Sequence, residues 1–243
     1  MPATSSTQSL KAASARQKLQ ALANPKKTAL IAGFFKTGPG QYGHGDIFIG
    51  VTVPQTRLVA RQYPQLPLAQ TSLLLHSPIH EERLLALLIL VEQFKKGDEK
   101  RRKEIFRFYL NNTRHINNWD LVDLSAGKII GKFLLDKDIA TLLKLAQSKD
   151  LWERRIAIIA TLAFIKDNRF DATLKIARIL LNDNHDLIHK AVGWMLREVG
   201  NQDLNKAEKF LKEHYRTMPR TMLRYTIEKF EATRRQKYLK GLI

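Results

Sequence analysis

Apolar residues recur at spacings of three and four along most of the chain, from about residue 53 to residue 230. This period places them on one face of an α-helix, and no alternating run of strand length competes with it. The sequence therefore predicts an all-α protein. After a first helix that starts at Asn24-Pro25, the expected helices are residues 56–63, 66–75, 80–95, 101–111, 119–134, 139–147, 151–165, 172–181, 187–198, 204–215 and 219–230.

Several of these helices begin with similar residues, which indicates a weak internal repeat. The matching stretches are residues 80–87, 151–158, 187–194 and 219–227. Equivalent positions at residues 83, 123, 155, 190 and 224 are separated by 40, 32, 35 and 34 residues. Periods of this size, built from two helices, predict an α-solenoid of HEAT-like repeats.

Most of the equivalent positions carry a cation: Arg83, Arg155, Lys190 and Arg224. A cation in the first turn of a helix opposes the macrodipole, at a cost of some tenths of a kcal/mol. Its recurrence predicts a row of cations along one concave edge, where helix N-termini also point their N–H groups. Such a basic groove suits a phosphate backbone. Asp123 is the one acid in the row.

The charge balance points in the same direction. Lys and Arg number 41 against 23 Asp and Glu, so the formal charge is +18 and a polyanion is expected as partner, with nucleic acid as the first candidate. A membrane surface is the weaker alternative, because no apolar run is long enough to span a bilayer. The chain has no cysteine, which excludes disulfides and thiolate metal sites.

Neither a metal nor a cofactor is expected. His76 and His80, and likewise His185 and His189, are four residues apart and share a helix face, but neither pair has a convincing third ligand.

Residues 1–24 are rich in Ser, Ala and bases and contain no acid, which predicts a flexible basic arm before a single repeat domain of residues 25–243. An organelle transit peptide is the alternative interpretation of the same composition. The glycine-rich loop of residues 38–45 is not a phosphate-binding P-loop, because no Gly-Lys-Ser/Thr closes it. Close approach to a phosphate and a long turn between helices both remain open for it.

Trp119 and Asp123 lie four residues apart near the start of an expected helix, so they share one face. A carboxylate beside an indole loses hydration, and a cation or a cationic transition state compensates for that loss. This pair is the candidate for chemistry. The alternative is a structural ion pair between Asp123 and an arginine of a neighbouring helix.

Several short fragments, taken in order, resemble one known family. They are Phe34-Phe35-Lys36-Thr37-Gly38, His80-Glu81 with Arg83, residues 117–123, Leu151-Trp152 with Arg154-Arg155, residues 189–198 and residues 218–221. Together they resemble the bacterial DNA alkylation repair glycosylases of the AlkD type, over roughly residues 29–242. The resemblance implies excision of cationic alkylpurines, such as 3-methyladenine and 7-methylguanine, from duplex DNA.

The resemblance also implies roles for single residues. The catalytic carboxylate falls on Asp123, and the two indoles beside the lesion's sugar fall on Trp119 and Trp194. The site arginine falls on Arg154 or Arg155, with Arg155 favoured. DNA contacts are expected at Phe34, where the family pattern can carry Tyr, and at Lys36, Arg83, Arg154, Lys190, Arg220 and Arg224.

This chemistry is consistent with the residues. A cationic alkylpurine leaves without protonation, so one carboxylate suffices to stabilise an oxocarbenium-like sugar and to place a water. Trp152 is expected in the core between repeats. The expected protein is a cytoplasmic, nucleoid-associated monomer on DNA.

Two other classes compete with the enzyme. A non-catalytic solenoid that binds damaged or branched nucleic acid would share the groove, but relatives of that kind lack the Trp and Asp that this chain keeps. A protein-binding HEAT adaptor would explain the repeats but not the charge.

Overall fold

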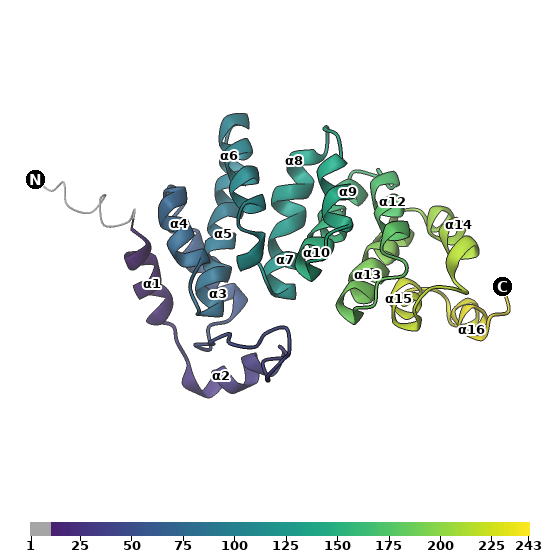
Figure 1. Cartoon of the computed structure of the whole chain (residues 1–243), viewed down its shortest axis with the longest axis horizontal. Helices are drawn as coiled ribbons and strands as arrows, with labels where there is room; N and C mark the ends of the chain where they lie inside the picture. Colours follow the sequence, from purple (N-terminus) through teal and green to yellow (C-terminus); the bar gives the residue numbers. More distant parts are fainter. Residues whose placement is uncertain (1–10) are drawn as a thin grey trace, which may run out of the picture. The chain divides into compact units, whose positions relative to one another are not determined.

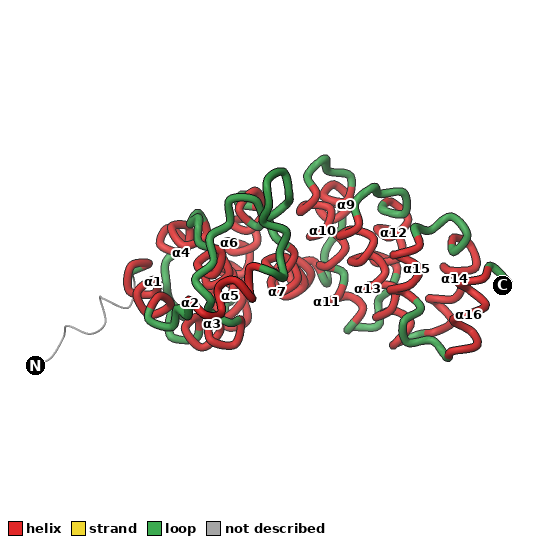
Figure 2. The backbone as a smooth tube through the Cα atoms, turned by 90° about the horizontal axis from the view of Figure 1, so that it is seen from below, coloured by secondary structure: helices red, strands yellow, loops and turns green. Residues whose placement is uncertain are grey.

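The computed structural model describes residues 11–243, and the chain divides into two compact units, Met1–Ser125 and Ala126–Ile243. Each unit is described by itself, and the expected single domain of residues 25–243 stays a prediction. Within the described residues the regular structure is helical, apart from an isolated parallel bridge between Ile47 and Ile79 (Figure 2). The all-α prediction is confirmed.

Unit 1 is built around one long helix. Its elements are α1 (Ala12–Gln20), α2 (Pro25–Ala32), α3 (Val53–Ala60), α4 (Leu68–Leu75), α5 (His80–Lys96), α6 (Glu99–Leu110), the short 3-10 helix Thr113–His115 and α7 (Trp119–Ala126). Helix α5 packs against α3, α4 and α6, and every residue from His80 to Leu90 is buried. A helix that is apolar on all sides through its middle belongs at the centre of a core.

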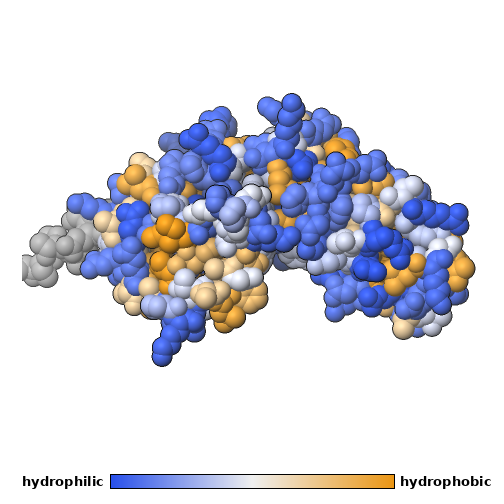
Figure 3. Space-filling view, turned by 60° about the horizontal axis from the view of Figure 1, so that its bottom comes forward, coloured by the Kyte–Doolittle hydropathy of each residue, from blue (hydrophilic) through white to orange (hydrophobic). Residues whose placement is uncertain are grey.

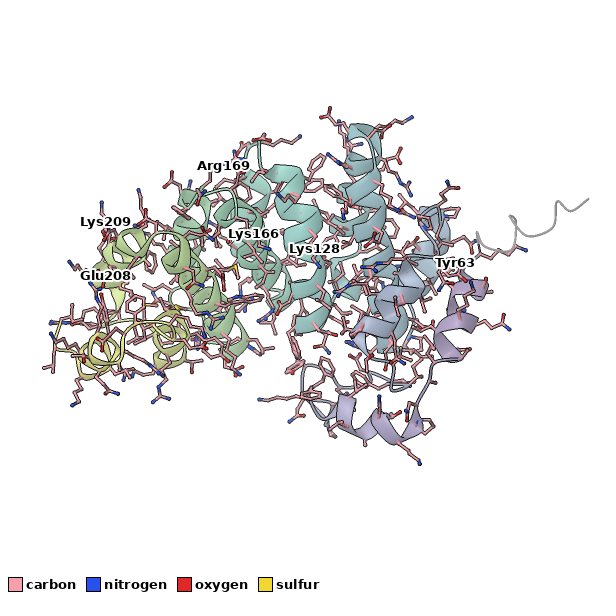
Figure 4. All side chains as sticks on the ribbon, turned by 180° about the vertical axis from the view of Figure 1, so that it is seen from behind. Tyr63, Lys128, Lys166, Arg169, Glu208 and Lys209 are labelled. Carbon is pink, nitrogen blue, oxygen red and sulfur yellow. The ribbon has the colours of Figure 1, made fainter. Side chains whose placement is uncertain are left out.

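The expectation of a flexible arm is wrong for the described part of residues 1–24. Helix α1 packs on α3 and α4, and it buries Ala15 and Leu19 completely. Its Arg16 forms a 2.8 Å ion pair with the buried Glu82 of α5. Tyr63, labelled in Figure 4, shares a 3.0 Å hydrogen bond with the Ser14 hydroxyl. Residues 1–10 lie outside the described residues.

Helix α2 contrasts with the rest of unit 1, because none of its residues is buried. In Figure 1 it stands apart from α4 and α6 and continues into a long loop, residues 33–52. Its start is fastened by the amide of Asn24, which donates to the carbonyl of Ile49 at 2.9 Å. This contact needs a glycine at Gly50, where φ is +80° and a Cβ would lie 2.2 Å from the Asn24 carbonyl oxygen.

Unit 2 stacks helices in pairs. Its elements are the π-helical segment Gly127–Gly131, α8 (Lys132–Leu134), α9 (Ala140–Ala146), α10 (Leu151–Ala160), α11 (Leu162–Ile165), α12 (Asp171–Ile179), α13 (Asp186–Gln202), α14 (Leu204–His214), α15 (Arg220–Thr226) and α16 (Ala232–Lys240). Helix α9 packs on α10 and α12 packs on α13, while α13 also contacts α10, α14 and α15. Gly193 lets α13 approach α15 closely, since a Cβ there would meet Tyr225 at 2.5 Å.

The predicted helices match the observed ones within a few residues, with three differences. The expected helix over residues 119–134 passes through the π-helical segment, where Gly131 approaches the carbonyl of Ala160 too closely for any side chain. The expected helix over residues 151–165 divides at Thr161 into α10 and α11. The predicted helices stop at residue 230, before α16, which is tied to α14 by a 2.6 Å ion pair between Arg234 and Glu208.

No helix in the described part of the chain is long and apolar enough to cross a membrane.

Candidate functional site

A cavity of about 400 Å³ opens on unit 1 where α2, the loop after it, α5 and α7 meet. Its lining is mainly apolar and aromatic, and we call it the aromatic cavity. It is lined by Ile31, Phe34, Phe35, Val51, Thr52, Val53, Pro54, His80, Glu81, Leu84, Trp119, Asp120, Asp123 and Leu124. Figure 3 shows apolar surface over the part of unit 1 that holds α2, where Leu30 and Phe34 are 66% and 67% exposed.

Aromatic rings form a continuous stack beside the cavity. The ring of Phe35 lies 5.2 Å from that of Trp119 and 5.1 Å from that of Phe48, both in stacked orientation. The imidazole of His80 lies 4.9 Å from Phe35 and 4.8 Å from Phe48. The loop after α2 and the first turn of α7 are therefore joined through their aromatic side chains over the start of α5.

A buried charge network lies beneath this stack. His80 Nε2 is 2.8 Å from the Asp120 carboxylate, and Nδ1 is 3.3 Å from the Asp46 carboxylate. Asp46 also accepts from Arg83 at 2.7 Å and from the Asn118 amide at 3.2 Å. Burial opposes the charge of His80, but the hydrogen bonds to Asp120 and Asp46 outweigh it and raise the pKa of His80 to about 9. Burial likewise opposes the charge of Asp46, whose pKa nevertheless falls below its usual value through the hydrogen bond with His80 and the charge of Arg83.

Glu81, beside His80, anchors the loop by a different route. Its carboxylate is 1% exposed and accepts hydrogen bonds from the backbone N–H groups of Ile49, Gly50 and Val51 at 2.9 to 3.3 Å. Backbone donors arranged around a buried carboxylate satisfy its charge without a cation. The first turn of α5 thus holds the loop of residues 33–52 at two points, Asp46 and residues 49–51.

Trp119 and Asp123 both line the aromatic cavity from α7, as their spacing predicts. Both are half-buried. The side chain of Asn118, directly before α7, accepts from the Trp119 amide at 2.8 Å. The structure therefore brings the predicted indole and carboxylate together on one wall of a largely apolar cavity.

The other predicted residues of unit 1 have different outcomes. Phe34 lines the same cavity, and Lys36 is exposed just after it. Arg83 differs from an exposed cation: its side chain is 6% exposed, and its guanidinium is held by Asp46 and the carbonyl of Ser77. The structure gives no support to its DNA contact, which stays a prediction.

In unit 2 the two adjacent arginines of α10 both form hydrogen bonds with other residues of that unit. Arg154 forms a 2.6 Å ion pair with Asp183 and donates to the carbonyls of Ser148 and Lys149. Arg155 is 5% exposed and donates to the carbonyl of Leu187 at 2.5 Å. Arg155 is thus buried, and both its place in the cation row and its assignment to the catalytic site stay predictions.

The remaining predicted residues of unit 2 are more accessible. Lys190 pairs with Asp186 at 2.8 Å, one turn earlier on α13. Trp194 is half-buried and donates from its indole N–H to Glu198 at 3.0 Å. Arg220 and Arg224 are exposed on α15. Their DNA contacts stay predictions, whereas the expected burial of Trp152 is confirmed at 7% exposure.

Sequence reasoning missed Phe35, Phe48, Asp46 and the role of His80. One signal was present: four consecutive polar residues, His80 to Arg83, precede a wholly apolar run at the start of α5. Polar side chains in such a position need buried partners. Those partners come from residues 46–51, which the sequence alone does not connect with α5. Within residues 11–243 no three His, Asp or Glu side chains gather as ligands for a metal ion.

The chain is similar to known proteins in sequence and in fold. The sequence model of a family described as "DNA alkylation repair enzyme" matches residues 15–230. A solved structure titled "Predicted DNA alkylation repair enzyme from Enterococcus faecalis" superposes with a TM-score of 0.67 and 17% sequence identity, over 86% of this chain and 97% of that one. At this identity the likeness shows the fold alone. A search of curated proteins finds no match.

Proposed function

The chain belongs to the DNA alkylation repair enzyme family, which supports a role in alkylation repair, and from this premise we propose that it is a DNA glycosylase. In this proposal it hydrolyses the bond between deoxyribose and a positively charged alkylpurine, such as 3-methyladenine or 7-methylguanine, in duplex DNA.

One observation carries the proposal: a carboxylate, Asp123, stands beside an indole, Trp119, in the lining of the aromatic cavity. Most of the cavity lining is apolar or aromatic, although His80, Glu81 and Asp120 also belong to it. An electrostatic group that acts in such surroundings is worth far more than the same group in bulk water.

The reaction needs no further catalytic group to protonate the leaving base. An alkylpurine that already carries a positive charge takes the electron pair of the glycosidic bond and leaves as a neutral base. The sugar then acquires oxocarbenium character, which the carboxylate of Asp123 opposes with its negative charge while it orients a water towards C1′. The π-face of Trp119 adds attraction to the same developing charge. The water loses its proton to solvent or to the carboxylate, and an abasic sugar remains.

The resemblance adds further residues to the proposal. Trp194 would serve as a second indole for the sugar, and Arg155 as the arginine that fixes a phosphate. Lys36, Arg154, Lys190, Arg220 and Arg224 would bind the backbone of the duplex, in keeping with a net charge of +18. These assignments rest on the resemblance and on charge, and each can be tested by a single substitution.

The test is release of free 7-methylguanine from methylated duplex DNA under single-turnover conditions. Asp123→Asn keeps the shape of the side chain but removes the charge, and we expect it to slow release about a hundredfold or more. Affinity for duplex DNA should stay equal or rise. The control is Glu104→Gln, which neutralises an exposed carboxylate of unit 1 on α6 and should leave the rate unchanged.

Three outcomes separate the alternatives. A wild-type protein that binds methylated DNA but releases no base would be a binding module, the competing interpretation. Full activity in Asp123→Asn would end the catalytic role of Asp123. A destabilised Asp123→Asn protein with a normal rate per folded molecule would make Asp123 a structural ion-pair partner instead.

A further inference from the structure

His80 contacts two of the other segments that line the aromatic cavity, the loop after α2 and helix α7. It belongs to α5, its two ring nitrogens face Asp46 of the loop and Asp120 of α7, and its ring contacts Phe35 and Phe48. The ring is 2% exposed. Its neighbours are therefore fixed, and solvent does not replace a contact that the ring loses.

The geometry favours the doubly protonated ring. Each ring nitrogen faces a carboxylate oxygen, at 2.8 Å for Asp120 and 3.3 Å for Asp46. A neutral imidazole carries one N–H, so one carboxylate would face a nitrogen lone pair, whereas an imidazolium donates to both. The other charges near the ring are Arg83, 3.5 Å from Nδ1, and the carboxylates of Glu81 and Asp123, which line the same cavity. Arg83 opposes the positive charge of the ring, and the carboxylates favour it.

The imidazolium also supports the aromatic wall. The centre of its ring is 4.9 Å from that of Phe35 and 4.8 Å from that of Phe48. A cation at this distance is attracted to the aromatic faces. Phe35 in turn stacks on Trp119, and Asp120, the partner of Nε2, is the next residue along α7. Trp119 is thus linked to His80 indirectly, through the neighbouring Asp120 and through the ring of Phe35.

We propose that His80 is a positioning residue for base release, which, as an imidazolium bound to Asp46 and Asp120, holds Trp119 and Asp123 at the wall of the aromatic cavity. The inference rests on the proposed glycosylase activity for its kinetic consequence. When the ring loses its proton, one of the two hydrogen bonds is lost, and the loop and α7 are no longer held to the same point. Release should therefore slow as the pH rises through the pKa of His80, which lies at about 9 because the hydrogen bonds to both carboxylates outweigh burial. The other ties of the loop, from Asp46 to Arg83 and Asn118, remain in place.

The experiment compares single-turnover release of 7-methylguanine by the wild type and by His80→Gln over a range of pH. The amide that replaces the imidazole in this variant donates hydrogen bonds but carries no charge, and it does not reach both carboxylates in the same way. We expect the wild type to be about tenfold or more faster at neutral pH, the effect of a misplaced catalytic group. The ratio should fall towards one as the pH rises through about 9. The titration of the substrate is common to both proteins and cancels in this ratio.

The matched control is His44→Gln, at an exposed histidine of the same loop. The ratio of the wild-type rate to the rate of this variant should stay at one over the whole pH range. A merely structural role for His80 predicts a ratio that does not change with pH, and that result would overturn the proposal. Asp120→Asn provides a second variant that retains an acceptor for Nε2. It should move the alkaline fall in rate to lower pH, since the imidazolium loses one of its two carboxylates.

A readout independent of catalysis completes the test. The ring proton of His80, followed by nuclear magnetic resonance in the full chain, should titrate near pH 9 in the wild type and lower in Asp120→Asn. Titration of the wild-type ring at the ordinary histidine value would overturn the proposal. If the wild type released no base at any pH while His80 still titrated as expected, the glycosylase assignment would fail. The failure would then lie with the proposed function and not with the charge state of the histidine.

Discussion

Helices α5 in unit 1 and α13 in unit 2 begin with similar sequences. They differ in the burial and the ion-pair partner of the cation near their start. Arg83, in the first turn of α5, is 6% exposed and pairs with Asp46, a loop residue far away in the sequence. Lys190, at the equivalent place of α13, is 38% exposed and pairs with Asp186 of its own helix. The repeat thus aligns the two residues in position but not in environment.

The difference lies in what covers each helix start. The loop of residues 33–52 reaches over the first turn of α5 and supplies the partners of His80, Glu81 and Arg83. At the start of α13, the partner of Lys190 is local. A repeat pattern therefore predicts where a helix begins and which face it buries. It does not predict whether a charged side chain on that face meets solvent or another segment of the chain.

The largest effect expected from this comparison is on stability. Arg83→Ala leaves the carboxylate of Asp46 buried without its arginine, which should cost about 3–5 kcal/mol in the free energy of unfolding. Lys190→Ala removes an exposed pair and should change it by less than about 0.5 kcal/mol. Denaturant unfolding followed by circular dichroism measures both. Similar losses for the two variants would mean that burial does not separate the two helix starts.

The pH dependence of stability sharpens the same contrast. The folded-state pKa of His80 is raised, so its contribution is fully present below about pH 6.5 and is lost as the pH rises through about 9. The loss should be on the order of 3 kcal/mol, since one pKa unit corresponds to about 1.4 kcal/mol. His80→Gln should remove this part of the pH profile. His185→Gln, which changes a more exposed histidine at the start of α13, should leave it in place.

The tryptophans of unit 2 provide a third comparison, between a core residue and a candidate site residue. Trp194→Ala should lower excision about tenfold or more while its loss of stability stays below the roughly 3–5 kcal/mol typical of a buried tryptophan. Trp152→Ala is the control: at 7% exposure it should show the full loss of stability. Melting temperature and single-turnover rate are measured on the same preparations. An equal drop in melting temperature would assign Trp194 to the core.

The smallest effect concerns affinity. Binding of undamaged duplex DNA should weaken steeply with salt, because lysines and arginines displace counterions from phosphates. Lys190→Ala should reduce the slope of log affinity against log salt by about one. Arg83→Ala, measured where it remains folded, should leave the slope unchanged. A lower slope in Arg83→Ala would support a DNA contact of Arg83.

The sequence was sufficient to predict the features of the fold that depend on the spacing of residues within one helix. The three-and-four spacing of apolar residues located most helices, and the Asn24-Pro25 pair marked the start of α2, where Asn24 accepts from the Lys26 amide as an N-cap. The spacing of Trp119 and Asp123 correctly placed both on one face of α7. These features follow from helix geometry alone.

What the sequence did not reveal depends on partners far apart in the chain. The basic, acid-poor composition of residues 1–24 favours a flexible arm, whereas Ala12, Ala15 and Leu19 are buried on one side of α1. The burial of Arg83 depends on Asp46, which lies 37 residues earlier in a loop without a regular pattern. No local rule connects the two.

The weak attachment of α2 affects how often this helix opens locally. The start of the helix is held by the bond from Asn24 to Ile49, while none of its own residues is buried. Its amides should exchange with solvent through local opening at low free energy, whereas those of α5 exchange only when unit 1 unfolds. One wall of the aromatic cavity can therefore open while the core stays folded. Such opening would widen the entrance to a cavity that already meets the surface of unit 1.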